Sequence, residues 1–126
     1  MMPLAVLMNR EITCVGADDT LAQVSEKMAA DRVGAVLVRQ DGEYPGILSE
    51  TDIVRKAIAS GMAPDTTIAK TVMSSPLITI DINQTLVDAN TIMSEKRIRH
   101  LIVTDRGDVA GIISVRDLVI YFKNRI

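Results

Sequence analysis

Two helices are predicted by apolar residues that recur at helical spacing. The first follows Thr20 and the second follows Thr85, and each places its apolar residues on a single face. Thr20 with Gln23, and Thr85 with Asp88, have the spacing of a capping box, in which each side chain accepts a hydrogen bond from the other residue's backbone N–H. The two apolar faces consist of Leu21, Val24 and Met28, and of Leu86, Ala89 and Met93.

Short apolar and β-branched runs predict three strands in each half of the chain. One strand precedes the helix, and two follow it, joined by a polar turn that contains glycine. A closing helix then runs from about Glu50 to Ser60, stopped by Gly61, and in the second half from about Val115 to Lys123. The predicted strands are 12–15, 35–39 and 46–49, then 77–80, 100–104 and 111–114, with turns at 40–43 and 105–108.

The two halves are copies of one unit. An offset of 65 residues, the difference between Met8 and Met73, aligns them without a gap. We place the repeats at 1–61 and 62–126, each with the order β-α-β-β-α, which predicts an α/β fold. Because so short a unit cannot bury its helices alone, we expect one compact body about a pseudo-twofold axis, with two related clefts between the repeats and a connector from Gly61 to Thr71.

Composition narrows the possible functions. Apolar residues make up 48% and charged residues 24%, as in a folded protein, and the net charge of −2 excludes an overall basic surface for nucleic acid. The one cysteine, Cys14, excludes an intrachain disulfide, and the one histidine, His100, excludes a metal site of several histidines. Because no apolar stretch approaches the ~18 residues of a membrane helix, we expect a soluble cytoplasmic protein.

One motif with candidate chemistry occurs twice, as residues 46–52 and 111–117. In each copy a strand ends at a serine, Ser49 or Ser114, and a helix follows with an aspartate three residues later, Asp52 or Asp117. Backbone N–H groups at a helix start attract phosphate, and a carboxylate can accept hydrogen bonds from two neighbouring hydroxyls, as in ribose. The same spacing is also that of a plain helix cap, and the motif alone leaves both interpretations open.

The duplicated unit resembles the CBS domain, named for cystathionine β-synthase, and two such units in one chain resemble a Bateman module. The resemblance extends from about Leu4 to Phe122. Cys14 stands where the second repeat has Thr79, and Gly34-Ala35 stand where it has Arg99-His100, so the first repeat departs from the family pattern. The resemblance is carried by Val72-Met73, Ile78-Thr79-Ile80, Thr85-Leu86, Arg99 to Val103, Gly107, Gly111 to Ser114 and Asp117-Leu118.

The resemblance implies a regulatory module and not an enzyme, without a required cofactor or metal. It implies that AMP, ADP, ATP or S-adenosylmethionine binds in the clefts between the repeats, and that the module forms a homodimer and modulates an unidentified partner protein. Asp52 and Asp117 would then hold the ribose, and Ser49 and Ser114 the phosphate. The other residues expected at the ligand are Thr79 in the adenine slot, and Arg99, His100, Arg116, Ile47 and Ile112.

The two motifs are expected to bind unequally. Arg99, His100 and Arg116 of the second repeat have Gly34, Ala35 and Thr51 as their counterparts. Arginine suits phosphate, so the motif of Ser114 and Asp117 is predicted to bind nucleotide more tightly.

A ligand-free dimerisation scaffold is the alternative function. In that case both serine–aspartate motifs are only helix caps, and the closing helices supply the dimer surface through Val54, Ile58, Val119, Ile120 and Phe122. An enzyme is disfavoured because the sequence has neither a phosphate loop nor a recognisable nucleophile–base pair, and nucleic-acid and membrane partners are not expected.

Overall fold

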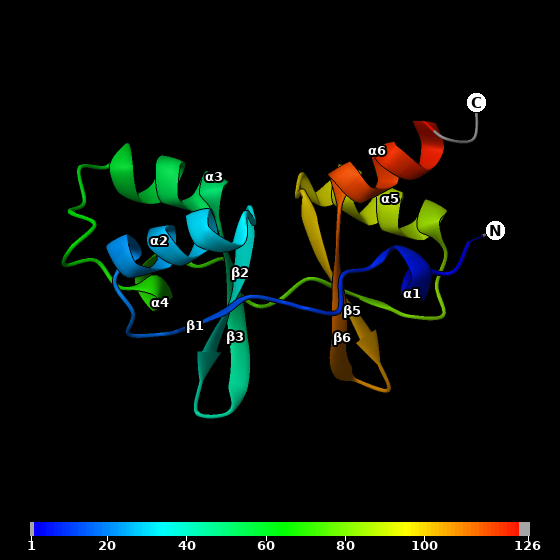
Figure 1. Ribbon diagram of the computed structural model, residues 1–126, viewed down its shortest axis with the longest axis horizontal. Coiled ribbons are helices and arrows are strands. Elements are labelled where there is room, and N and C mark those ends of the chain that lie inside the picture. Colours follow the sequence, from blue (N-terminus) through cyan, green and yellow to red (C-terminus); the bar gives the residue numbers. More distant parts are fainter. Residues whose placement is uncertain (1, 124–126) are drawn as a thin grey trace. The chain divides into compact units, whose positions relative to one another are not determined.

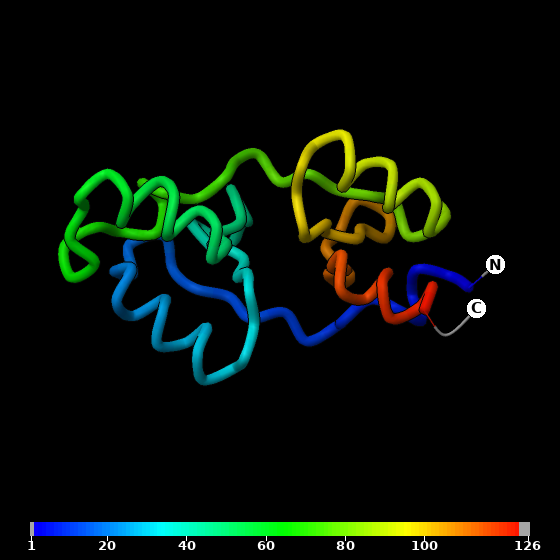
Figure 2. Tube along the Cα trace, turned by 90° about the horizontal axis from the view of Figure 1, so that it is seen from above, coloured from blue at the N-terminus to red at the C-terminus, as the bar shows by residue number. Residues whose placement is uncertain are grey.

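The computed structural model describes residues 2–123 of the chain. The chain forms two compact units, of which unit 2 is Thr13–Leu77 and unit 1 combines Met1–Ile12 with Ile78–Ile126. The chain therefore passes from one unit to the other twice, after Ile12 and after Leu77 (Figure 2). The repeat bounds of 1–61 and 62–126 concern the copies in the sequence and stay a prediction, as do the pseudo-twofold packing and the clefts.

Unit 2 is built on a three-stranded sheet in the order β1-β2-β3, with β1 parallel and β3 antiparallel to β2 (Figure 1). This sheet and its helices confirm the predicted α/β order of the first repeat. Its elements are β1 (Cys14–Gly16), α2 (Leu21–Asp31), β2 (Ala35–Gln40), β3 (Glu43–Ser49), α3 (Glu50–Asp52), η1 (Ile53–Ile58) and α4 (Ala69–Val72).

Unit 1 repeats this plan in its sheet, β4-β5-β6, with the same strand directions. The predicted helix after Thr85 and the predicted closing helix are both confirmed. Its elements are α1 (Leu4–Leu7), β4 (Thr79–Asp81), α5 (Leu86–Lys96), β5 (His100–Asp105), β6 (Asp108–Ser114) and α6 (Val115–Lys123).

Local sequence signals account for the ends of these elements. Thr20 and Thr85 each close the predicted capping box with the side chain three residues later. The two hairpin turns place Asp41-Gly42 and Arg106-Gly107 at positive φ, as a tight two-residue turn between antiparallel strands requires. Gly61, at φ 78°, follows the first closing helix where the sequence predicts a stop.

The structure differs from the sequence prediction in its short helices. The closing helix of unit 2 is regular only over α3 and continues as a π-helix, η1, with wider hydrogen bonds such as that from Ala59 N to Val54 O. The expected connector, Gly61 to Thr71, runs into α4, whose Ala69 and Val72 belong to the apolar core of unit 2. The segment therefore packs into one unit rather than only joining two.

The same kind of packing brings the start of the chain into unit 1. Leu4 of α1 is fully buried in the apolar core of unit 1, together with Leu101 and Ile113 of the sheet. The helix α1 lies beside α6 and β6 (Figure 1). Since α1 and α4 precede equivalent strands of the two repeats, each unit is completed by the segment that leads into the other unit's first strand.

Candidate functional site

One face of the unit 1 sheet carries four of the predicted site residues. His100 pairs with Ser114 across β5 and β6, while Ile102 pairs with Ile112 on one side and with Thr79 on the other. Paired residues on neighbouring strands, and alternate residues along a strand, share a face. Thr79, His100, Ile112 and Ser114 therefore lie on one face around Ile102, opposite to the face that forms the core.

The corresponding face of the unit 2 sheet has the same layout with different chemistry. Ala35 pairs with Ser49, and Leu37 pairs with both Ile47 and Cys14. Cys14 and Ala35 thus occupy the places that Thr79 and His100 have in unit 1. This face offers fewer polar groups than its counterpart, as the sequence comparison of the repeats predicts.

Ser114 and Asp117 form a reciprocal cap at the start of α6. The Asp117 backbone N–H donates to Ser114 Oγ at 3.2 Å, and Asp117 Oδ2 accepts from Ser114 N at 2.8 Å and from Ser114 Oγ at 2.9 Å. The helix-cap interpretation of this motif is therefore confirmed. Asp117 Oδ1 accepts no hydrogen bond from any residue in the range 2–123, and the side chain is half-buried. The carboxylate is held in one orientation with one oxygen available.

Two arginines lie close to this motif in the chain or the sheet. Arg116 is in the first turn of α6, and the backbone oxygen of Arg99 accepts a hydrogen bond from Val115 N at 2.9 Å. Both arginine side chains are exposed, and neither forms an ion pair within the described part of the chain. Their guanidinium groups are therefore available for an anion.

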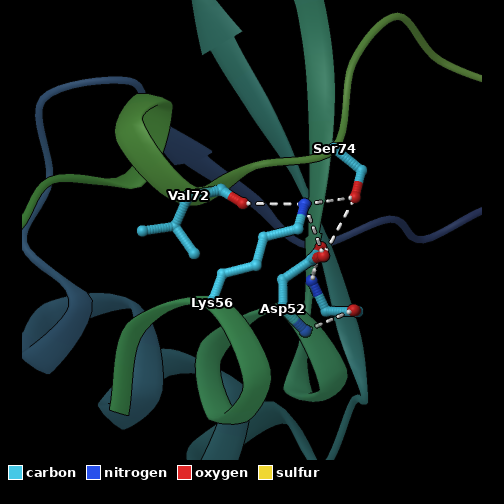
Figure 3. A network of polar contacts seen from close by, with 5 residues as sticks. Asp52, Lys56, Val72 and Ser74 are labelled. Carbon is cyan, nitrogen blue, oxygen red and sulfur yellow. Dashed lines mark hydrogen bonds and ion pairs between the residues drawn. The ribbon is translucent and has the colours of Figure 1, made fainter. Parts of the chain in front are cut away.

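Ser49 and Asp52 form the equivalent cap in unit 2, but Asp52 has further partners. Asp52 N donates to Ser49 Oγ and Asp52 Oδ2 accepts from Ser49 N, both at 3.1 Å. Asp52 Oδ1 accepts from Ser74 Oγ at 2.9 Å and forms an ion pair with Lys56 Nζ at 2.9 Å (Figure 3). Asp52 is 7% exposed and is the one buried charged residue in the described range. Both of its carboxylate oxygens are occupied by the protein itself.

Lys56 and Ser74 were not predicted from the sequence. The spacing of Asp52 and Lys56, four residues apart on a helix, is a local signal for an ion pair. Ser74 gave no such signal, because it reaches Asp52 only through the backbone pairing of Ser74 with Ile47 beside β3. We call the set of Asp52, Lys56, Val72 and Ser74 the Lys56 clasp.

Outside the two motifs, Arg39 and Tyr44 form a hydrogen-bonded pair. The pKa of Arg39 is raised by its hydrogen bond to the Tyr44 hydroxyl, which keeps an already charged group charged. Across residues 2–123 no group of three or more His, Cys, Asp or Glu side chains is placed to hold a metal ion. In the same range, no helix is both long and apolar enough to cross a bilayer.

Comparison with known proteins assigns the family. The model of the CBS domain matches residues 5–59 and again residues 69–124. An uncharacterized protein of Methanopyrus kandleri is 32% identical over 87% of this chain, which spans 57% of that relative's length.

Solved structures agree with this assignment. A CBS-domain containing protein of Agrobacterium tumefaciens superposes with a TM-score of 0.88 at 30% identity, covering 99% of this chain and 100% of that one. A hexameric CBS-CP12 protein from bloom-forming cyanobacteria superposes with a TM-score of 0.86 at 25% identity, covering 94% of this chain and 70% of that one. The chain therefore belongs to the CBS-domain family and carries two copies of the domain in tandem.

Proposed function

We propose that the chain is a regulatory module that binds an adenine nucleotide, AMP, ADP or ATP, or S-adenosylmethionine. Tandem CBS domains are generally regulatory, ligand-binding modules. The observation that carries the finer proposal is the Asp117 carboxylate, which Ser114 fixes through one oxygen and leaves open at the other. A fixed acceptor of this kind suits the two neighbouring hydroxyls of a ribose, which all four ligands contain.

The groups around Asp117 support the same ligand class. Arg116 and Arg99 supply positive charge for phosphate, or for the carboxylate of S-adenosylmethionine. On the sheet face, Ile112 offers apolar surface and Thr79 a hydroxyl, a combination that suits a flat heteroaromatic base. Ligand binding would regulate a partner protein only as far as the two states of the module differ in affinity for the ligand.

Thermal unfolding with added ligand tests this function. A ligand that binds only the folded chain adds about 2.7 kcal/mol of stability when its free concentration is ~100 times Kd. We expect a higher Tm with AMP, ATP or S-adenosylmethionine and an unchanged Tm with cytidine monophosphate, which has ribose and phosphate without adenine. The variant Asp117→Asn should lose most of the response. An unchanged Tm with all three adenine compounds at millimolar concentration would refute the proposal.

A ligand-free scaffold is the second candidate, favoured by exposed apolar side chains on the closing helices. Val54 and Ile58 are exposed on η1, and Val119, Ile120 and Phe122 are exposed on α6. Apolar side chains in such numbers on one type of element are typical of an interface. If this is the function, the chain self-associates and no adenine compound changes its Tm.

A further inference from the structure

Within the Lys56 clasp, the ammonium group of Lys56 has three oxygen atoms as partners. Nζ lies 2.9 Å from Asp52 Oδ1, 3.0 Å from Ser74 Oγ and 3.3 Å from the Val72 carbonyl oxygen (Figure 3). An ammonium group has three N–H donors, and these three acceptors account for all of them. Ser74 completes the network because its hydroxyl accepts from Lys56 and donates to Asp52. Each N–H donor of the Lys56 ammonium group therefore has an acceptor within the clasp.

The described part of unit 1, residues 2–12 and 78–123, shows no equivalent of this network. At the offset that aligns the repeats, Lys56 corresponds to Tyr121 and Ser74 corresponds to Asn9. Tyr121 packs against the apolar core of unit 1, and Asn9 uses its Oδ1 to accept from Glu11 N at 3.0 Å. Among residues 2–123, the hydrogen bonds of the Asp117 carboxylate come from Ser114. The backbone pairing of Asn9 with Ile112 reproduces that of Ser74 with Ile47, so the difference lies in the side chains and not in the fold.

From this contrast we infer that Lys56 prevents a ligand from binding to the Asp52 carboxylate. The chain then binds one nucleotide, at the motif of Ser114 and Asp117. This inference rests on the proposed function and adds the residue that decides which motif works. A ribose hydroxyl could reach Asp52 Oδ1 only by displacing the ammonium group or Ser74. A neutral hydroxyl would replace an ion pair, and the freed ammonium would lose its charged acceptor beside a largely buried site.

The charges beside each motif also favour nucleotide binding at Ser114 and Asp117 over binding at Ser49 and Asp52. Glu50 follows Ser49 in the first turn of α3, where it repels phosphate, whereas neutral Val115 and then Arg116 follow Ser114. These neighbours alone would weaken binding at the first motif. The clasp also occupies Asp52, which would be the acceptor for ribose. The first motif is therefore expected not to bind nucleotide, and not merely to bind it more weakly.

Amide hydrogen exchange in the wild-type chain, with and without saturating AMP, locates the bound nucleotide. ATP and S-adenosylmethionine serve as further probes. We expect exchange to slow at residues 114–117 and to stay unchanged at residues 49–52, and calorimetry to give one ligand per chain. Slower exchange at both motifs, or two ligands per wild-type chain, would overturn the inference. No binding of any probe would instead overturn the proposed function, so the two failures are distinguishable.

The variant Lys56→Met tests the lysine directly, because it keeps the length of the side chain and removes its charge. We expect a second ligand per chain and slower exchange at residues 49–52 with AMP. Lys56→Arg is the matched control, since it restores a charged partner for Asp52, and it should again bind one ligand. A folded Lys56→Met chain that still binds one ligand would contradict the assignment to Lys56. If that variant does not fold, the wild-type exchange map decides alone.

Discussion

Two glycines are required where a neighbouring segment crosses a strand at close range. A Cβ on Gly46 would lie 2.6 Å from the backbone oxygen of Ser74, and a Cβ on Gly111 would lie 2.6 Å from the Met8 sulfur. We expect Gly46→Ala to lower the free energy of unfolding by about 1–3 kcal/mol. Gly111→Ala should cost less, because its two shortest contacts are with the Met8 side chain and its nearest backbone atom, Asn9 O, lies at 3.0 Å. Urea denaturation measures both changes.

Gly16 provides the control for these substitutions. The nearest atoms to a Cβ on Gly16 are the Asp19 carboxylate oxygens at 3.4 Å, an ordinary contact. Gly16→Ala should therefore leave the unfolding midpoint nearly unchanged. Equal midpoints for Gly16→Ala and Gly46→Ala would contradict a close approach of the Ser74 backbone to Gly46.

The two motif aspartates should differ in their contribution to stability. Asp52→Asn removes the charge that faces Lys56 and part of the clasp, whereas Asp117→Asn disturbs only a helix cap. The Lys56 side chain is 48% exposed, so solvent screens the ion pair. We therefore expect losses of about 1–3 kcal/mol for Asp52→Asn and at most about 1 kcal/mol for Asp117→Asn in urea denaturation. Equal losses would contradict a structural role that is specific to Asp52.

At the scale of the element, both long helices end on a non-glycine residue in the left-handed region. Arg32 follows α2 at φ 55°, and Arg97 follows α5 at φ 54°. A side chain with a Cβ is disfavoured there by about 1–2 kcal/mol, while glycine is not. Because glycine also gains entropy in the unfolded chain, we expect Arg97→Gly to raise the free energy of unfolding by about 0.5–1 kcal/mol.

Lys96 is the matched control for that substitution, since it is the preceding residue, is also basic and exposed, and is still within α5. Lys96→Gly should lower the free energy of unfolding by about 1 kcal/mol, in the opposite direction. Thermal unfolding of both variants gives the comparison. Two changes of the same sign would mean that the end of α5 frays and does not hold Arg97 in this conformation.

Element boundaries show what the sequence could and could not predict. The capping boxes, glycine turns and apolar faces are local patterns, and they predicted six strands and both long helices of the described chain. The spacing of the serine–aspartate motifs allowed the helix caps that form, but it did not by itself distinguish a cap from a ligand site. The short helices α1 and α4 were missed because four residues form a helix only when packing supports them. Ser74 was missed for the same reason, because its contact with Asp52 depends on a crossing 22 residues further along the chain.

At the scale of the whole molecule, the chain carries two versions of one serine–aspartate motif. The sheet face, the serine–aspartate cap and the crossing segment recur in both units. Because the fold is maintained by positions that match between the repeats, positions such as 56 and 121 can differ without changing it. One copy can then use its aspartate to bind its own lysine, while the other keeps the carboxylate open.

Self-association is the property of the whole molecule that the closing helices predict. Val119 is 57% exposed on α6, beside exposed Ile120. If these side chains form an interface, charged substitutions there introduce an unpaired charge into it. We predict that the wild-type chain sediments as a dimer in analytical ultracentrifugation and that Val119→Asp sediments as a monomer. Val87 of α5, which is 53% exposed and outside the closing helices, is the control, and Val87→Asp should leave the dimer intact. A monomeric wild-type chain, or equal effects of both variants, would exclude the closing helices as the interface.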